Sequence, residues 1–468
     1  RLHQKTVASK FAERLDMDPW WFSCKREILV KGVIKNKSGW EVNTQTGELR
    51  KRTLESMWTF ESPAAIRDDM LVRDAEGNLK TNERGNFLVN FRMGLYDAHV
   101  EFLKTNNHFE HPLKNVIAFM TNCIDTKGKH ESLQRWFGAC LTTHVIKQWV
   151  YMHGDTNTGK SWLLKLIKNV LGKADTAISK GVLFQMSEGN ASGHTAHMMT
   201  LEKKRSVTFC ESKGNYVVND NIVKQISGDD EFIGRDCYGK KERTFKPVCK
   251  ITCASNYLPN CDTSDNALAS RNVIFKMNTT FVKRTYDRDG VLVPLKENEK
   301  YEDPEMVRYL KETEAGMNEV FTWMVCGAVD FCQRNMDVGW PQEVVADTNE
   351  FNLAQNNVGK FLKEQTDTYP ESEYTDTERL ETKTARQLSR GKDLTEIFKA
   401  YKQWCRDTGI HVELQKKGIN DFKAELKKGG LYVDTGKFVA ETGDGPKRKT
   451  HLRGYRVHLR TECRPFVK

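Results

Sequence analysis

Residues 154–161 read GDTNTGKS and lie between an apolar run at 149–152 and a helix-forming run at 162–171. They match the pattern G-x-x-x-x-G-K-[ST] in the strand, loop and helix context that it requires. In such a loop the backbone N–H groups turn inward around phosphates, the lysine neutralises their oxygens and the hydroxyl offers a magnesium ligand. The alternative is a glycine-rich loop that binds no ligand. We predict that ATP and Mg²⁺ bind here, to Gly154, Asp155, Thr156, Asn157, Thr158, Gly159, Lys160 and Ser161.

The segments around this loop alternate between strand and helix patterns. Helices are predicted at residues 115–124 and 133–146, before the apolar strand at 149–152. From there to Met277 strands and helices alternate, which is typical of an α/β domain with a central, mostly parallel sheet. Further helices are expected from Val217 to Ile226 and from Met306 to Cys332.

Four polar features follow the loop along the chain. A strand at 206–209 leads to Glu211, whose carboxylate could hold magnesium, activate water or simply be solvated. Two short strand-like runs flank Lys240 and Lys241 and predict a hairpin with a basic tip, or a merely solubilising turn. Asn256 follows a strand at 251–255 and could instead be a turn residue. Arg271 precedes another strand and could instead form a surface ion pair.

The ordered set resembles the superfamily 3 helicases, and most closely the branch that contains the poxvirus-type primase-helicases and the phage and plasmid primases. The matching residues are Glu211, KQISGDD at 224–230, Arg235 with Tyr238, Phe245 with Pro247, Asn256 with Pro259, and Asp265 with Arg271. The clear resemblance covers residues 131–277. Two positions depart from the pattern: Asp229 replaces a glycine, and Cys210 stands where an aspartate often precedes Glu211.

The resemblance implies a viral or mobile-element replicative helicase with an AAA+-like P-loop core, assembled as a homohexamer. ATP would lie between subunits, and Ser161 and Glu211 would bind its magnesium ion. One protomer would supply Lys160, Glu211 and Asn256, and its neighbour would supply Arg271. The hairpin, with Arg235, Lys240 and Lys241, would contact single-stranded or forked DNA in the channel.

The ends of the chain predict further parts. Residues 1–112 form a mixed α+β region without assigned chemistry, 113–280 the ATPase core, 281–366 a helical extension and 367–392 a linker. In residues 393–468 the sequence predicts helices at 393–406 and 419–428, followed by strands at 431–439 and 451–459. This order of elements resembles a winged helix. The basic tip of that hairpin, another predicted DNA contact, is Lys447, Arg448 and Lys449.

Composition agrees with these expectations. The net charge is +10, and residues 386–468 alone hold 20 Lys/Arg against 10 Asp/Glu. Such a basic end suits phosphate backbones or is a solvated charged face. The cysteines are scattered, with Cys249 and Cys253 interpreted as core residues, and they predict reduced thiols in an intracellular compartment. The lack of a long apolar run predicts a protein with no membrane partner. We expect it in the host cytoplasm or a viral replication compartment, cut from a polypeptide with an N-terminal primase domain.

Three functions remain open. The leading hypothesis is an ATP-dependent DNA helicase. The second is a nucleic-acid-binding loader or initiator that uses ATP only to assemble its ring. The third, a P-loop kinase or metabolic ATPase, leaves the lysine hairpin, Asn256 and Arg271 without explanation.

Overall fold

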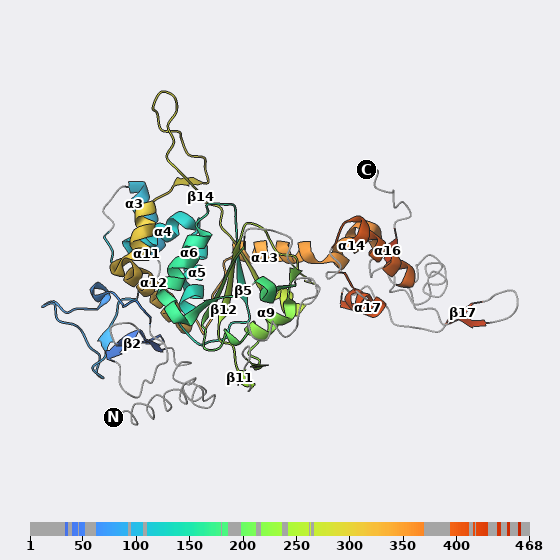
Figure 1. Ribbon diagram of the computed structural model, residues 1–468, viewed down its shortest axis with the longest axis horizontal. Coiled ribbons are helices and arrows are strands. Elements are labelled where there is room, and N and C mark those ends of the chain that lie inside the picture. Colours follow the sequence, from blue (N-terminus) through green and yellow to red (C-terminus); the bar gives the residue numbers. More distant parts are fainter. Residues whose placement is uncertain are drawn as a thin grey trace, which may run out of the picture. The chain divides into compact units, whose positions relative to one another are not determined.

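The computed structural model shows two compact units (Figure 1). One comprises residues 1–259 and 270–349, the other 260–269 and 350–468. The structure describes residues 33–35, 40–44, 46–51, 62–91, 95–105, 110–178, 180–185, 198–211, 217–235, 242–261, 263, 266–368, 394–410, 415–416, 418–428, 438–440, 447–449 and 457–459.

A five-stranded sheet forms the centre of the first unit. Its order is β13-β5-β12-β8-β6, and every adjacent pair is parallel. The strands are short, largely apolar and buried, as expected for a parallel sheet covered by helices. This confirms the predicted α/β fold with a central parallel sheet. The bounds are β5 (Trp149–His153), β6 (Asp175–Ala177), β8 (Ser206–Glu211), β12 (Lys250–Ser255) and β13 (Asn272–Lys276).

Two tryptophans of this core have paired indole N–H groups. The indole N–H of Trp136 donates to Thr252 Oγ1 at 2.9 Å, and that of Trp149 donates to Asn272 Oδ1 at 2.8 Å. Cys249 and Cys253 are buried with free thiols, which confirms their interpretation as core residues. Because both of these indole donors find a partner, Trp136 and Trp149 fill the core without a large desolvation cost.

Helices from before and after the sheet strands gather on one side of the sheet in Figure 1. The tightest crossing joins α5 and α12, where a Cβ on Gly138 would lie 2.2 Å from the Ala328 nitrogen and one on Gly327 2.1 Å from the Gln134 oxygen. Both glycines are therefore required for backbone contact. The helices are α4 (Lys114–Cys123), α5 (Lys127–Ala139), α6 (Lys160–Leu171), α11 (Pro304–Glu312) and α12 (Glu314–Gln333).

Three helix predictions need correction. The helix predicted at 133–146 ends at Ala139, where the Thr142 hydroxyl donates to the Ala139 carbonyl and competes with the helix ladder. The helix predicted from Met306 to Cys332 is two helices, because Thr313 caps α12 by accepting from the Gly316 N–H. The third helix, predicted from Val217, starts after Asn219, which caps α9 (Asp220–Ser227).

Smaller elements surround the core. The N-terminal region has a four-stranded antiparallel sheet whose Val42 and Leu49 join the main core. Its elements are β1 (Val33–Lys35), β2 (Trp40–Asn43), β3 (Glu48–Lys51), β4 (Phe87–Leu88), the 3₁₀ turn η2 (Asp68–Met70) and α3 (Leu95–Thr105). Elsewhere lie η3 (Gly172–Ala174), α7 (Lys180–Leu183), β7 (Phe184–Gln185) paired with β9 (Val217–Val218), β10 (Phe232–Gly234) paired with β11 (Arg243–Phe245), β14 (Thr280–Val282) paired with β15 (Glu299–Tyr301), and α13 (Gln342–Gln355). The short helix α10 (Asn266–Ala269) belongs to the second unit.

The second unit has its own core. The predicted apolar face of α16 is buried, including Ile397 and Tyr401, and it packs on Phe361 of α14 and Phe422 of α17. Thus α14, which the sequence attached to the ATPase core, shares a core with the C-terminal helices. The elements are α14 (Asn357–Gln365), β16 (Thr366–Thr368), α16 (Leu394–Asp407), α17 (Ile419–Lys428), β17 (Phe438–Ala440), β18 (Lys447–Lys449) and β19 (Val457–Leu459).

The predicted C-terminal hairpin is wrong in its second strand. β17 pairs with β18 so that Ala440 is opposite Lys447, which leaves residues 441–446 to connect the strands. Lys447, Arg448 and Lys449 therefore belong to a strand and not to the tip, because the turn-forming Gly-Asp-Gly-Pro run precedes them. The last strand, β19, pairs with β16.

Candidate functional site

The predicted site residues follow adjacent strands of the central sheet. Ser255 at the end of β12 is in register with His153 of β5 on one side and Glu211 of β8 on the other. Because parallel strands end at the same edge, the loop after β5 and Asn256 after β12 meet there. The edge thus brings together groups that are 100 residues apart in the sequence.

The loop after β5 is shaped by close contacts at its two glycines. A Cβ on Gly154 would lie 2.3 Å from the Met277 oxygen, and one on Gly159 would lie 2.9 Å from Cys123 Sγ. Gly159 also has φ 84° as the N-cap of α6, a conformation that favours glycine. The loop is also bonded to β14, since the Phe281 N–H donates to the Asn157 carbonyl at 2.8 Å. This geometry aims the N-terminus of α6 at the sheet edge, where anions are stabilised.

Lys160 is held inside this loop. Its side chain is 6% exposed, and Nζ donates to the carbonyls of Gly154 and Asp155 at 2.7 and 2.6 Å and to Thr158 Oγ1 at 2.8 Å. Burial lowers the pKa of Lys160 to about 8, and the nearby Asp155 carboxylate partly opposes this change. The three hydrogen-bond acceptors of the ammonium are neutral, so a phosphate group would add an anion that bonds it directly.

A pocket of about 410 Å³ opens in front of Lys160. Six of the eight predicted loop residues line it, and the other two, Gly154 and Asp155, hold Lys160. Asn256 lines it as well, and Ser161 exposes its hydroxyl there. The polar groups of Lys160, Ser161 and Asn256 fit a nucleoside triphosphate with its magnesium ion. The sequence did not predict Trp162, Cys210, Ala254 or Ser255 as site residues, although they also line the pocket. Each is next to a strand end or a motif residue, which was the available signal.

Glu211 and Arg271 are placed differently relative to this pocket from Lys160 and Asn256. Glu211 ends β8 two strands away from β5, and only its backbone is described. Cys210, at the position of the family aspartate, lines the pocket instead. Arg271 precedes β13 and does not line the pocket; its Nε donates to Ser227 Oγ at 3.2 Å. Within one chain, therefore, the described residues bring together Lys160 and Asn256 but not Arg271.

The predicted nucleic-acid contacts are only partly described. β10 and β11 pair as the expected hairpin, and exposed Arg235 follows β10. Lys240 and Lys241 lie outside the described residues. Asp229, which replaces the family glycine, has φ 71° and pairs with Lys246 at 2.5 Å. The family glycine thus reflects a left-handed position, which aspartate tolerates better than most residues.

A parallel α/β sheet with this loop and a buried lysine at its carboxyl edge defines a P-loop protein. Comparison with known proteins shows which proteins this chain is similar to. Residues 152–271 match the model of a family of unknown function (DUF5906). The chain is 25% identical over 181 residues to a candidate helicase, 022R, of frog virus 3 (isolate Goorha), which covers 38% of this chain and 18% of that protein.

Poxvirus proteins match the same extent of chain. An uncoating factor of vaccinia virus (strain Western Reserve), OPG117, is 26% identical over 36% of this chain and 22% of its own length. Primase D5 of fowlpox virus (strain NVSL) is 25% identical over 32% and 19%. The chain thus matches only about a fifth of the length of these relatives. Over that part it is similar to viral helicase and primase proteins, which confirms the resemblance to viral primase-helicases predicted from the motifs.

Solved structures match more distantly. The C-terminal region of NrS-1 covers 91% of this chain and 98% of its own, at 12% identity and a TM-score of 0.36. A JCV helicase covers 57% and 69%, at 11% identity and a TM-score of 0.28. Among the described residues, no helix has the length and apolar character that crossing a membrane requires.

Proposed function

We propose that this chain is the ATP-dependent motor of a superfamily 3 DNA helicase, acting as a homohexamer on single-stranded or forked DNA during viral or mobile-element replication. The observation that carries the proposal is the shared strand edge, which puts Lys160 and Asn256 on one pocket. The helicase and primase names of the viral relatives support it. Such a motor would work beside a primase domain, in the host cytoplasm or a viral replication compartment.

The wider architecture supports the AAA+-like and winged-helix-like assignments. β12 lies between the P-loop strand β5 and the acidic strand β8, so a polar residue after β12 can reach between the phosphates and the carboxylate. In the second unit, two helices precede the β17–β18 pair that contains Lys447, Arg448 and Lys449. That order suits a DNA-binding module, in which these cations would oppose phosphates.

Each pocket residue has a role that its position suits. Lys160 would neutralise the β and γ phosphate oxygens of ATP, and Ser161 would provide a hydroxyl ligand for Mg²⁺. Asn256 would hold the attacking water near the γ-phosphate, with Glu211 as the base or magnesium partner. Bound magnesium would withdraw charge from the phosphates. Arg271, absent from its own chain's pocket, would act on the site of a neighbouring protomer.

Lys160→Ala tests the nucleotide assignment. We expect ATP hydrolysis to fall at least about 100-fold, because the buried cation that opposes phosphate charge is lost. Lys168→Ala is the matched control, since Lys168 is exposed on the same helix and lines neither described pocket. Wild-type turnover in the Lys160 variant would contradict a nucleotide site.

Unwinding of a forked duplex separates the helicase from a loader that uses ATP only for assembly. We expect the wild-type chain to release the labelled strand with ATP and Mg²⁺, and the Lys160 variant to release none. ATP hydrolysis and ring assembly without any strand release would favour the loader.

A further inference from the structure

Residues 283–295, which follow β14, form an exposed arm. Figure 1 shows the connection between β14 and β15 extending away from the helices near it. Every residue from 283 to 295 is exposed. Five of the thirteen are large and apolar, with exposed fractions from 38% to 62%: Tyr286, Val291, Leu292, Val293 and Leu295. Large apolar side chains gathered on one exposed segment mark a surface that contacts another molecule.

The arm is a β-hairpin with a defined turn. The Val293 N–H donates to the Thr285 carbonyl at 2.9 Å, and the Asp287 N–H donates to the Val291 carbonyl at 2.9 Å. At the turn, Asp287 Oδ1 accepts from the N–H groups of Asp289 and Val291 at 2.9 and 2.8 Å. These bonds present the apolar side chains on a preorganised backbone. A two-stranded hairpin alone is only marginally stable in water, so a partner that covers it would stabilise it.

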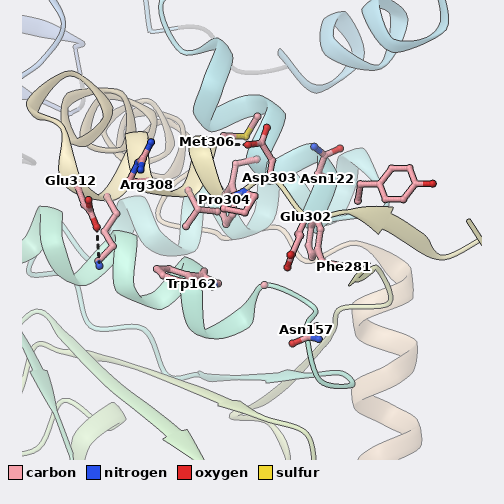
Figure 2. A pocket seen from close by; sticks show the side chains of 15 residues that line it. Asn122, Asn157, Trp162, Phe281, Glu302, Asp303, Pro304, Met306, Arg308 and Glu312 are labelled. Carbon is pink, nitrogen blue, oxygen red and sulfur yellow. Dashed lines mark hydrogen bonds and ion pairs between the residues drawn. The ribbon is translucent and has the colours of Figure 1, made fainter. Parts of the chain in front are cut away.

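The foot of the arm is bonded to the P-loop. The Phe281 N–H of β14 donates to the Asn157 carbonyl at 2.8 Å, and Figure 2 shows both residues at the edge of one cavity. This aromatic cavity measures about 350 Å³ and is lined by Trp162, Phe281 and Tyr301, among others. The Tyr301 hydroxyl of β15 also donates to the Val293 carbonyl within the arm at 3.0 Å. The arm therefore begins beside the P-loop and is held there from both of its strands.

The charge of the arm favours a protein partner over nucleic acid. Three basic residues and two acidic residues almost balance: Lys283, Arg284, Arg288, Asp287 and Asp289. A phosphate backbone is bound mainly by clustered cations. Protein interfaces instead have an apolar centre with a polar rim. An arm with five large apolar side chains and nearly balanced charge has the second composition.

The position of Arg271 indicates which protein lies against the arm. Under the proposed function, Arg271 acts on a neighbouring copy, because it does not line the P-loop pocket of its own chain. The copy that supplies Arg271 has to lie against the rim of that pocket, where the arm begins. A standard interface involves roughly 20–30 residues on each side. The thirteen exposed arm residues would supply about half of them.

From these observations we infer that the arm packs on a second copy of this chain, on the face of that copy that carries Arg271. The inference rests on the proposed function and deepens it, since it names the surface that joins two protomers beside their shared ATP site. The contact is head-to-tail, because the arm and Arg271 belong to different faces of one chain. Such contacts generate rings when the rotation closes.

The concentration at which the full chain assembles tests the inference. Sedimentation velocity would measure it with Mg²⁺ and a non-hydrolysable ATP analogue. One variant, Tyr286→Ser/Val291→Ser/Leu292→Ser, removes apolar surface from the arm, and a second, Val291→Asp/Leu292→Asp, adds charge to it. The matched control is Leu103→Ser, since Leu103 on α3 is apolar and 55% exposed outside the arm.

We expect the midpoint concentration of assembly to rise at least about tenfold in both arm variants and to stay within about twofold in the control. ATP affinity, measured by displacement of a fluorescent analogue, should stay within about twofold in all three, because the arm does not line the P-loop pocket.

Unchanged midpoints in both arm variants, or a wild type that stays monomeric, would overturn the inference. A midpoint that rises together with weaker ATP binding would also overturn it, because the substitutions would then act on the pocket itself. Loss of single-stranded DNA binding with wild-type assembly would assign the arm to nucleic acid instead. Failure of the proposed function would be seen separately, as ATP hydrolysis that Lys160→Ala leaves intact.

Discussion

Gly154 and Gly159 show why single positions matter at the sheet edge. Both are needed for space and not for flexibility alone. A side chain on Gly154 would meet the Met277 carbonyl, and one on Gly159 would meet the Cys123 thiol. The loop can therefore close around Lys160 only when both positions lack a Cβ. Close approach, and not chain mobility, gives the phosphate loop its shape.

Lys250 is another buried lysine, and its contacts are structural. It is 1% exposed, and Nζ donates to the carbonyls of Thr142 at 2.7 Å and Val248 at 3.2 Å. Burial lowers the pKa of Lys250 from 10.5 to about 8. Between these two values the unfolded chain binds more protons than the folded chain, so the free energy of unfolding should rise with pH.

This predicts a pH profile that depends on Lys250. From about pH 8 to about pH 10 the free energy of unfolding of the wild type should increase by about 2 kcal/mol more than that of Lys250→Met. Urea titrations at each pH would measure both. Lys168→Met, which changes an exposed lysine, should follow the wild type. Parallel profiles for wild type and Lys250→Met would show that burial does not shift this lysine.

Among the elements, the β10–β11 hairpin is the one whose role is easiest to test. Its strands pair as predicted, and the connecting segment contains Lys240 and Lys241. In a ring, several copies of this basic segment would concentrate positive potential on a bound strand. Neither lysine belongs to the proposed nucleotide site, so hydrolysis and DNA contact should separate in variants.

Changing Lys240 and Lys241 together to Ala should leave basal ATP hydrolysis within about twofold of the wild type, because the phosphate site is untouched. DNA stimulation and fork unwinding should be lost, and single-strand binding should depend less steeply on salt. The control is the double variant Lys104→Ala/Lys296→Ala, which removes two exposed lysines elsewhere. Wild-type unwinding by the hairpin variant would move the DNA contact to another element.

The packing of α14 on α16 and α17 makes a second prediction for the elements. Phe361 is fully buried, with ring centroids 5.5 Å from Tyr401, 5.9 Å from Trp404 and 6.3 Å from Phe422. Phe361→Ala should cost about 3–5 kcal/mol through lost contacts and a cavity. Hydrogen exchange should then accelerate in peptides from α16 and α17 but not in those from β5 and β12.

Leu353→Ala serves as the comparison, since Leu353 on α13 is 73% exposed and its truncation should leave exchange unchanged. If α16 and α17 stayed as protected in the Phe361 variant as in the wild type, α14 would not share their core.

For the assembled molecule, the position of Arg271 is the decisive feature. Arg271 bonds Ser227 within its own chain and does not line that chain's P-loop pocket. An arginine that acts from a neighbour would stabilise charge on the γ-phosphate and make hydrolysis depend on assembly. The proposed hexamer would then have six shared sites and no complete site in a free protomer.

Mixing two inactive variants tests this arrangement. Arg271→Ala should bind ATP but hydrolyse it poorly, and Lys160→Ala should fail to use ATP. In mixed rings, about one interface in four pairs an intact Lys160 with an intact Arg271, so about a quarter of wild-type hydrolysis should return at equal mixing. No recovery at any ratio, in rings that native mass spectrometry shows to be mixed, would argue against action between protomers.

Local patterns in the chain were sufficient for the parallel α/β class, the P-loop and the kinship with viral primase-helicases. Strand periodicity and the spacing of glycine and lysine are short-range properties, and a strand followed by GDTNTGKS leaves few alternatives. Helix ends were harder, because the caps at Asn219 and Thr313 compete with apolar periodicity that continues through them.

Contacts between distant segments could not be read from the chain. The strand order sets Asn256 beside the P-loop and leaves Arg271 away from it, since each depends on which strands pair across 100 residues or more. The same holds for the aromatic cavity, to which α4, α6, α11 and two short strands each contribute one or a few side chains. Sequence periodicity reports which face of an element is apolar, but only the packed chain specifies what that face meets.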